Sequence, residues 1–156
     1  MRRIRFIWIG KLKKEWWQNA ADEYLRRIQP QLPCETIIIK DAPAHLDTPA
    51  KKTWEGAKIL EKIGPHDFPV VLDEHGKTMT SPTLSTKLTT WTEDPATAPC
   101  FIIGGAYGLS DEVLAASRAK LSLSPMTFPH ELARVILLEQ VYRALSIAKG
   151  SPYHHA

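Results

Sequence analysis

One segment of the sequence joins a short apolar run to a cluster of glycines, an arrangement that lets a backbone approach a ligand. It reads Phe101-Ile-Ile-Gly-Gly-Ala-Tyr-Gly-Leu-Ser110. Because they have no Cβ, Gly104 and Gly105 leave room for a bound molecule, and Gly108 permits a left-handed turn. The spacing matches no dinucleotide fingerprint, no P-loop and no G-x-S-x-G nucleophile elbow, so the chemistry of those motifs is not indicated. A purely structural turn is the alternative.

A second candidate segment spans residues 121–130 and contains two prolines. Proline holds the backbone extended and cannot donate to a sheet ladder, so neighbouring backbone groups are free to bind the edge of an adenine ring. Met126 and Phe128 offer an apolar wall for such a ring. The alternative is a plain connection between a strand and a helix.

The end of the chain carries basic and aromatic groups that could act on a substrate. Arg134 and Arg143 lie in an otherwise apolar helix pattern, where an unpaired guanidinium is costly to bury. We expect each to face a cleft, a carboxylate or a phosphate, and a solvated or ion-paired position is the alternative. His130 opens this helix, where the helix dipole disfavours a protonated imidazole. The tail Tyr153-His-His-Ala156 reads by default as a frayed terminus or a tag remnant.

Alternating strand and helix patterns must position these segments. A Thr48-Pro49 pair and a Ser81-Pro82 pair are expected to cap and start two of the helices, and His75-Gly76 is expected to form a turn. The run Ile37-Ile-Ile39 is typical of a buried strand. The expected strands span 4–9, 35–40, 68–72, 100–103 and 121–123, and the expected helices span 15–28, 48–63 and 81–91, one capped by Ser110, and 129–148.

This alternation predicts an α/β fold, a three-layer single domain over residues 1–156 with a mostly parallel sheet. Ligands of such sheets bind beyond the carboxyl ends of the strands, which directs attention to the loops after Leu72, Ile103 and Leu123. The last helix is apolar around more than one stripe. We therefore expect it to be buried on two sides, by the sheet and by a partner subunit.

Composition narrows the class of protein. The 156 residues carry a net charge of +3, and no apolar run approaches the ~20 residues that a membrane helix needs. Cys34 and Cys100 have no second cysteine or histidine at metal-ligand spacing, so we expect reduced thiols, no metal and a cytoplasmic location. The first 27 residues are rich in lysine and arginine and form either an RNA-binding patch or a solvated face. The eight basic residues among them are Arg2, Arg3, Arg5, Lys11, Lys13, Lys14, Arg26 and Arg27.

Several of these segments together resemble one known family. The resemblance spans nearly the whole chain, is most specific from Phe101 onward and is loose over residues 40–66. The segments are similar to the RlmH proteins, the pseudouridine N3-methyltransferases of the SPOUT superfamily that act on bacterial 23S rRNA. The matching stretches are Glu23-Tyr-Leu-Arg-Arg27, Val71-Leu-Asp73 followed by Gly76-Lys77, Ile102-Ile-Gly-Gly-x-x-Gly-Leu-Ser110, Leu123-Ser-x-x-Thr-Phe-Pro-His130, Arg134, Glu139-Gln-Val-Tyr-Arg143 and Pro152-Tyr-His154.

The resemblance implies a SPOUT methyltransferase fold with a C-terminal trefoil knot, a homodimer and S-adenosylmethionine as cofactor. It also implies that the tail completes the substrate site, which argues against a tag remnant. Two departures are Ala106-Tyr107 after the glycine pair, which bears on loop shape, and His155, which bears on the last contact with RNA. Carried over by position, the cofactor-binding residues are Leu72, Gly104, Gly105, Leu123, Ser124, Pro125, Met126, Thr127 and Phe128.

A mechanism follows as a hypothesis. The donor is a sulfonium with an electrophilic methyl group, so the enzyme has chiefly to align donor and acceptor. The proton on N3 of pseudouridine must leave, and we assign His154 as the base, with Tyr153 orienting it or stacking on the nucleobase. Arg134 would neutralise charge at the reacting ring. His130 and Arg143 would bind the RNA.

Two other functions stay open at this point. A related enzyme with the same cofactor could modify a tRNA or a ribose 2′-hydroxyl. The protein could also be a non-catalytic RNA-binding module with a vestigial pocket. Because the basic patch is small, we expect the assembled ribosome rather than naked 23S rRNA to be the substrate.

Overall fold

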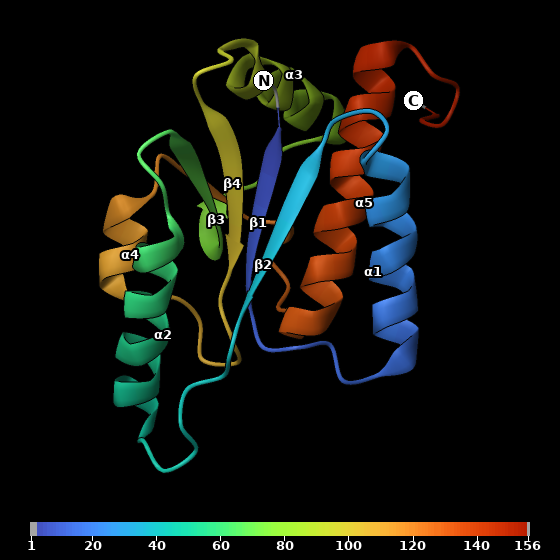
Figure 1. Cartoon of the computed structure of the whole chain (residues 1–156). Helices are drawn as coiled ribbons and strands as arrows, with labels where there is room; N and C mark the ends of the chain where they lie inside the picture. The colour runs from blue at the N-terminus through green and yellow to red at the C-terminus, as the bar shows by residue number, and fades with distance from the viewer. Residues whose placement is uncertain (1–2, 156) are drawn as a thin grey trace.

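A sheet of five parallel strands forms the centre of the molecule (Figure 1). The computed structural model describes residues 3–155. Strand β1 (Ile4–Ile9) lies between β2 and β4, so the first strand in the chain is an inner strand of the sheet. In spatial order the strands are β2 (Cys34–Ile39), β1, β4 (Ala98–Ile103), β3 (Asp67–Lys77) and β5 (Ala119–Leu121).

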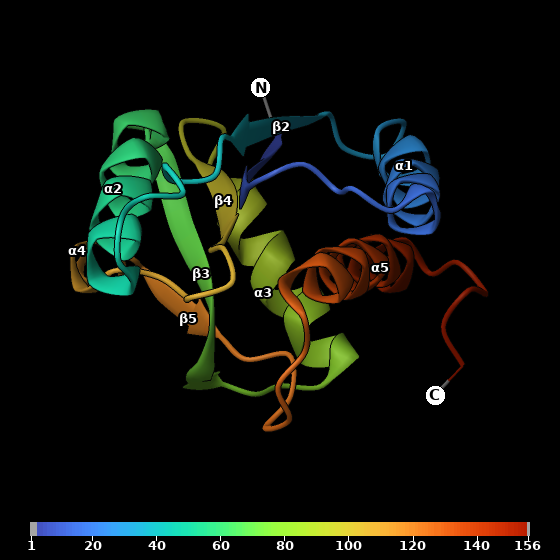
Figure 2. The ribbon, with the colours of Figure 1, turned by 90° about the horizontal axis from the view of Figure 1, so that it is seen from below.

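Helices cover both faces of this sheet. One face carries α1 (Glu15–Ile28), α3 (Ser81–Glu93) and α5 (His130–Lys149), and α5 packs between the other two. The opposite face carries α2 (Thr48–Lys62) and α4 (Asp111–Ala116). Figure 2 shows the two helical layers on either side of the strands. The predicted three-layer α/β architecture is confirmed.

Strand β1 shows why both layers are needed. All six of its residues are buried, and successive side chains point to opposite faces. Phe6 and Trp8 pack in the core beneath α1, α3 and α5, whereas Ile7 and Ile9 pack in the core beneath α2 and α4. A strand that is apolar on both faces is stable only when both faces are covered.

Two helices begin at the predicted residues but have N-caps one residue earlier than predicted. Asp47 rather than Thr48 caps α2 and accepts a hydrogen bond from the Ala50 amide at 2.9 Å. Thr80 rather than Ser81 caps α3 and accepts from the Thr83 amide at 3.2 Å. The predicted caps were wrong because each proline is the second residue of its helix, not the first. Ser110 caps α4 as predicted, accepting from the Val113 amide.

The predicted turn at His75-Gly76 is wrong, because β3 continues through it to Lys77. The continuity depends on a register shift, in which Leu121 of β5 pairs first with Leu72 and then with Lys77. Strand β5 correspondingly spans 119–121 rather than 121–123. A residue other than glycine at position 76 would place its Cβ 2.8 Å from the carbonyl of Lys120.

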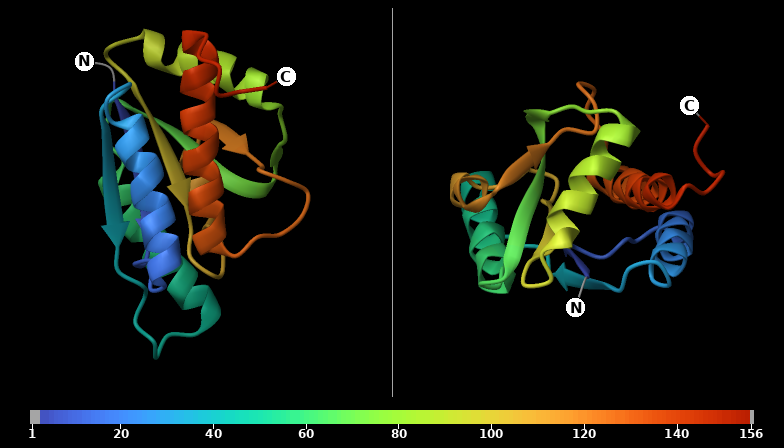
Figure 3. Two further views of the ribbon diagram at one scale, coloured as in Figure 1. Left: turned by 90° about the vertical axis from the view of Figure 1, so that its right-hand side faces the viewer. Right: turned by 90° about the horizontal axis from the view of Figure 1, so that it is seen from above.

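Two expectations about burial also change. Strand β2 lies at an edge of the sheet, and Ile38 is 50% exposed, so the triple-isoleucine run is not a fully buried strand. Much of the apolar surface of α5 is covered within the same chain by α1 and α3 (Figure 3).

Gly150 ends α5 in the left-handed conformation with φ of 74°, as its position after the helix predicts. The trefoil knot stays a prediction.

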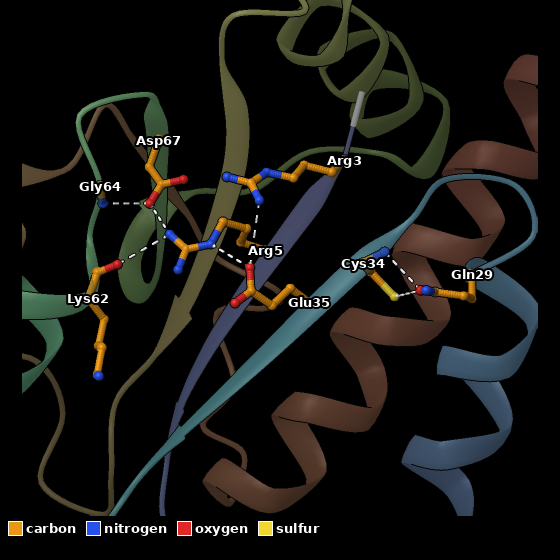
Figure 4. Close-up of polar contacts among 8 residues, drawn as sticks. All are labelled: Arg3, Arg5, Gln29, Cys34, Glu35, Lys62, Gly64 and Asp67. Carbon is orange, nitrogen blue, oxygen red and sulfur yellow. Dashed lines mark hydrogen bonds and ion pairs between the residues drawn. The ribbon is translucent and has the colours of Figure 1, made fainter. Parts of the chain in front are cut away.

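Ion pairs hold together the end of the sheet where the strands begin (Figure 4). The Arg5 guanidinium binds the carboxylates of Asp67 and Glu35 and donates to the Lys62 carbonyl at 3.2 Å. Asp67 also accepts from the Gly64 amide at 2.7 Å. Although burial opposes it, the charge of Asp67 raises the pKa of Arg5. This network ties β1 and β2 to the α2–β3 connection, at the edge opposite the loops that the sequence singled out.

No helix within residues 3–155 is long and apolar enough to cross a membrane. In the same residues, no group of three or more histidine, cysteine or acidic side chains is arranged to hold a metal ion. Cys34 and Cys100 are free thiols, and burial raises the pKa of Cys100 to about 12.

Candidate functional site

A cavity of about 1010 Å³ opens beyond the carboxyl ends of β3, β4 and β5. In Figure 1 this is the lower end of the sheet, where the β4–α4 loop and the start of α5 lie. The volume is at the upper end of the range for small-molecule and cofactor sites. The cavity therefore lies where a parallel α/β sheet is expected to bind its ligand.

The cavity gathers most of the residues that were expected to hold a cofactor. Pro125 is the exception: it belongs to the same loop but does not line the cavity. His130, expected to bind substrate, also lies on the wall. The expected residues that line it are Leu72, Gly104, Gly105, Leu123, Ser124, Met126, Thr127 and Phe128.

Several lining residues escaped the sequence analysis. Asp73 and Glu74 directly follow Leu72, where a ligand-binding loop was expected, but neither is among the expected site residues; β3 continues through both. Lys52 comes from α2, in the stretch where the family resemblance is loose. Leu109 is the one with a visible signal, since it stands inside the glycine segment. Glu131, beside His130, adds a third carboxylate to the wall.

The glycine segment folds back on itself at the end of β4. Gly105 and Gly108 form an isolated antiparallel bridge, and the Gly108 amide donates to the Gly105 carbonyl at 3.1 Å. Gly108 has φ of 84°, the left-handed conformation predicted for it. A Cβ on Gly104 would lie 2.9 Å from the backbone of Gly108, so only glycine at position 104 lets the two sides of this loop pack this closely.

Helix α2 supports this loop from behind. A Cβ on Gly105 would lie 2.9 Å from Oε1 of Glu55, and Gly56 is in close contact with the Ser110 side chain. Oε2 of Glu55 accepts from the Ala42 amide at 3.3 Å, whereas Oε1 has no hydrogen-bond partner within residues 3–155. Burial raises the pKa of Glu55. The loop therefore rests on a buried carboxyl group.

Short-range hydrogen bonds shape the other wall, formed by residues 122–129. The Ser122 hydroxyl donates to the Ser124 carbonyl at 2.9 Å, and the Ser124 hydroxyl accepts from the Met126 amide at 2.9 Å. The Thr127 hydroxyl donates to Glu74 at 3.2 Å, which links this wall to β3. Met126 is 75% exposed at the mouth of the cavity.

Arg134 lies near the cavity but not on its wall. Its guanidinium is buried and donates to the carbonyls of Ile9 and Gly10, the second at 2.8 Å. Burial lowers the pKa of Arg134 to about 10, so the side chain stays charged at neutral pH. Arg134 thus joins the end of β1 to α5, a role with backbone carbonyls that the sequence analysis did not consider.

The other three expected residues lie together against the middle and second half of α5, away from the cavity. Arg143 donates to Glu139 at 2.9 Å, and the Tyr153 hydroxyl donates to the same carboxylate at 2.6 Å. The guanidinium carbon of Arg143 lies 4.8 Å from the centre of the Tyr153 ring. The bond to Glu139 raises the pKa of Tyr153, which keeps the phenol neutral.

His154 belongs to the same cluster. Its Nδ1 lies 3.1 Å from a terminal nitrogen of Arg143. Because a guanidinium can only donate, Nδ1 accepts, and a neutral imidazole then carries its proton on Nε2. Glu139 and Arg143 therefore hold both functional groups of the tail.

The cavity and the tail are far apart within one chain. His130 begins α5 at the cavity, and the tail folds back onto Glu139 and Arg143, farther along this helix. At 1.5 Å per residue these two residues lie about 14 and about 20 Å from His130 along the helix axis. The structure brings the expected cofactor residues together with His130, but does not bring His154, Tyr153 or Arg143 to them.

Comparison with known proteins agrees with this architecture. The family model described as "Predicted SPOUT methyltransferase" matches residues 2–154. The chain is 50% identical over 155 residues to "Ribosomal RNA large subunit methyltransferase H" of Maridesulfovibrio salexigens, covering 99% of each chain. It is 49% identical to the protein of that name from Oleidesulfovibrio alaskensis, covering 99% of this chain and 100% of the other.

A third relative with this name, from Nitratidesulfovibrio vulgaris, is 45% identical over 99% of both chains. The matches run through the glycine segment, the wall at 122–129 and α5 alike, and the resemblance seen in the sequence is confirmed. The chain therefore belongs to the SPOUT methyltransferase family, within the group of proteins named ribosomal RNA large subunit methyltransferase H.

Proposed function

We propose that this protein is an S-adenosylmethionine-dependent methyltransferase that acts in the cytoplasm on N3 of a pseudouridine in 23S rRNA, within the assembled ribosome. The observation that carries the proposal is the cavity beyond β3, β4 and β5, lined by the expected cofactor residues. The names of the relatives, which specify methylation of large-subunit ribosomal RNA, supply the substrate class.

The residues of the cavity suit S-adenosylmethionine. Gly104 lets the loop after β4 close against Gly108 at the cavity wall, and Leu109 and Leu121 provide apolar surface for an adenine ring. Asp73, Glu74 and Glu131 line the same cavity, and carboxylates favour a ligand that carries an ammonium and a sulfonium. When bound, this cofactor supplies a methyl group that its sulfonium makes electrophilic.

A homodimer would bring a tail to the cavity. The residues that bind the tail, Glu139 and Arg143, lie about 14 and about 20 Å from the start of α5, and the tail does not reach the cavity of its own chain, so we assign the tail at each cavity to a second copy. An apolar stripe on α5 offers a contact surface: Leu132, Val135 and Ile136 are only partly buried and share one face by helical spacing. We infer a two-fold dimer in which each tail serves the partner's cavity.

The tail residues then have defined roles. His154 would accept the N3 proton at Nδ1, which requires that this atom leave Arg143. An RNA phosphate is the natural competitor for the Arg143 guanidinium, so substrate binding would free the imidazole. Tyr153, held as a neutral phenol, would stack on the target base, and Arg134 would position the end of β1 against α5 rather than touch RNA.

Methyl transfer from labelled S-adenosylmethionine tests this function. The acceptors are ribosomes that lack large-subunit pseudouridine methylation, with purified 23S rRNA compared in parallel. Label on N3 of a single pseudouridine, in ribosomes but not in free rRNA, is the expected result. Label on a tRNA or on a ribose would contradict the substrate, and cofactor binding without transfer to any RNA would favour a non-catalytic module.

A further inference from the structure

The start of α1 exposes a group of basic and aromatic side chains that the proposed reaction has not used. Lys11, Lys13 and Lys14 are exposed, Trp16 is 61% exposed and Trp17 is partly buried. We call these five residues the Lys–Trp surface. A largely exposed tryptophan is unusual, because burial of its large apolar side chain would stabilise the protein.

The side chains of this surface are arranged around the exposed indole. Nζ of Lys14 lies 5.5 Å from the centre of the Trp16 ring, and the Trp17 ring lies 6.5 Å away at 61°. Lys14 is the N-cap residue of α1 but its side chain caps nothing. Trp16 belongs to neither hydrophobic core, so the fold does not require it.

The structure also separates these lysines from the rest of the basic run. Arg3 and Arg5 pair with Glu35 at the far edge of the sheet, and Arg26 and Arg27 pair with Glu23 on α1. Arg2 lies outside the described residues. Within residues 3–155, none of the three lysine ammonium groups lies within 4.0 Å of a carboxylate.

The Lys–Trp surface lies at the cavity end of the sheet. Trp8 pairs with Ile103 across β1 and β4, and Ile103 lines the cavity. The chain then turns at Gly10, whose carbonyl binds Arg134 of α5, and continues directly into Lys11. Figure 2, viewed from the cavity end, shows the β1–α1 connection passing beside the start of α5.

We propose that the Lys–Trp surface is a docking site for the substrate RNA, where an unpaired nucleobase stacks on Trp16 and the lysines hold the adjoining phosphates. This inference rests on the proposed function, since the RNA is the methyl acceptor. An exposed aromatic ring beside cations is the chemistry that recognises single-stranded RNA in loops. The position beside the cavity suits nucleotides that flank the target base.

The charges favour RNA over a second copy of this chain. A two-fold contact centred on this surface would place three lysines against their own equivalents, and lysine is depleted at protein–protein interface cores. Phosphates would neutralise the same three charges.

Steady-state methylation of ribosomes, with cofactor binding measured by calorimetry, tests the proposal. We expect Trp16→Ala to raise the KM for ribosomes about tenfold with kcat within about twofold of wild type, and Trp16→Phe to recover most of the loss. The combined variant Lys11→Gln, Lys13→Gln, Lys14→Gln should also raise KM and flatten its salt dependence. Cofactor affinity should not change.

A charge-matched control removes three lysines elsewhere, with Lys58→Gln, Lys62→Gln and Lys87→Gln, and should leave KM near the wild-type value. A KM unchanged in both Trp16→Ala and the lysine variant would overturn the docking site while leaving the proposed function intact. Conversion of a wild-type dimer to monomer by Trp16→Ala would also overturn it, by assigning the surface to a second copy. Failure of the wild-type protein to methylate ribosomes contradicts the proposed function itself and is seen before any variant is compared.

Discussion

At the scale of single residues, Glu139 connects the groups that would act on RNA. Its carboxylate accepts hydrogen bonds from Tyr153 and Arg143, and Arg143 in turn binds His154. No other acidic side chain contacts this cluster within the described chain, so the placement of the tail depends on one carboxylate. Glu139 is therefore a positioning residue in the proposed mechanism.

Replacement of Glu139 should loosen the tail without damaging the fold. Glu139→Gln keeps the shape but loses the charge that makes both hydrogen bonds strong, so we expect kcat to fall about tenfold. Hydrogen exchange of residues 151–155 should quicken, whereas cofactor affinity should hold. Glu35→Gln is the matched control, because Glu35 also binds two arginines but lies on β2 beside Arg5, on the sheet face opposite α5. Unchanged exchange in the tail would show that Glu139 does not hold it.

A second residue-scale prediction concerns the carboxyl group behind the glycine loop. Burial raises the pKa of Glu55 above its value in the unfolded chain, and Asp41 adds to the shift while Lys51 and the Ala42 amide oppose it. A raised carboxyl pKa means that the folded state favours the proton. Ionisation of Glu55 therefore leaves the free energy of unfolding unchanged at a pH below its pKa in the unfolded chain. It lowers the free energy of unfolding as the pH rises through its pKa in the folded protein.

Glu55→Gln should remove this penalty. We expect the variant to have the wild-type Tm in acid and a higher Tm at neutral pH. The corresponding gain in the free energy of unfolding at neutral pH should be about 1 kcal/mol. Thermal unfolding from pH 4 to pH 8 without cofactor measures the difference. Glu61→Gln, an exposed change on the same helix, should show no such trend. A difference that shrinks as pH rises would have the wrong sign and would contradict a buried, proton-favouring Glu55.

At the scale of elements, the loop after β4 makes the cavity. The Cβ of Gly104→Ala would lie 2.9 Å from the Gly108 backbone and from Leu109, so the loop must open and the cavity wall must move. We expect cofactor affinity to drop at least about tenfold and stability to fall by roughly 1–3 kcal/mol. Calorimetric titration with S-adenosylmethionine and thermal unfolding measure the two effects.

A glycine outside the cavity supplies the control. Gly64→Ala brings its Cβ no closer than 3.5 Å to Asp67, an ordinary contact, and should bind cofactor like the wild type. Full cofactor affinity in Gly104→Ala would mean that the loop does not shape the binding site.

The same elements show what could be predicted from the sequence. The glycine segment was recognisable because apolar periodicity ends at Ile103, and the carboxyl-end rule then located the cavity. The run of β3 through His75 was not recognisable, because a register shift depends on the pairing of Lys77 with Leu121 of another strand. Tertiary pairing decided where that strand ends, and with it the position of Asp73 and Glu74.

At the scale of the whole molecule, the sequence placed residues in one site that the chain keeps apart. His130 and His154 both fit the family pattern, yet α5 lies between them as a rigid spacer. Arg134 shows the same limit, since its partners are carbonyls of β1, more than a hundred positions earlier. Residue types indicated the chemistry, whereas only the packing of α5 against α1 and α3 fixed which groups can meet.

Mixing two inactive variants tests whether the tail acts on the partner's cavity. Gly104→Ala impairs the cavity and His154→Ala removes the proposed base, so each homodimer should lose most of its activity, about 10²-fold or more in kcat for His154→Ala. If the tail serves the partner, a mixed dimer contains one intact cavity facing one intact tail. Random pairing of equal amounts should then recover about a quarter of the wild-type sites.

A site built within one chain gives the opposite result, because every chain in the mixture carries one defect. Activity that stays at the level of the two variants, with subunit exchange verified by mass, would therefore contradict the shared site and assign each tail to the cavity of its own chain. Recovery would explain why the tail folds onto Glu139 and Arg143 rather than toward the cavity of its own chain: the dimer axis, rather than the fold of either chain, brings the base to the methyl donor.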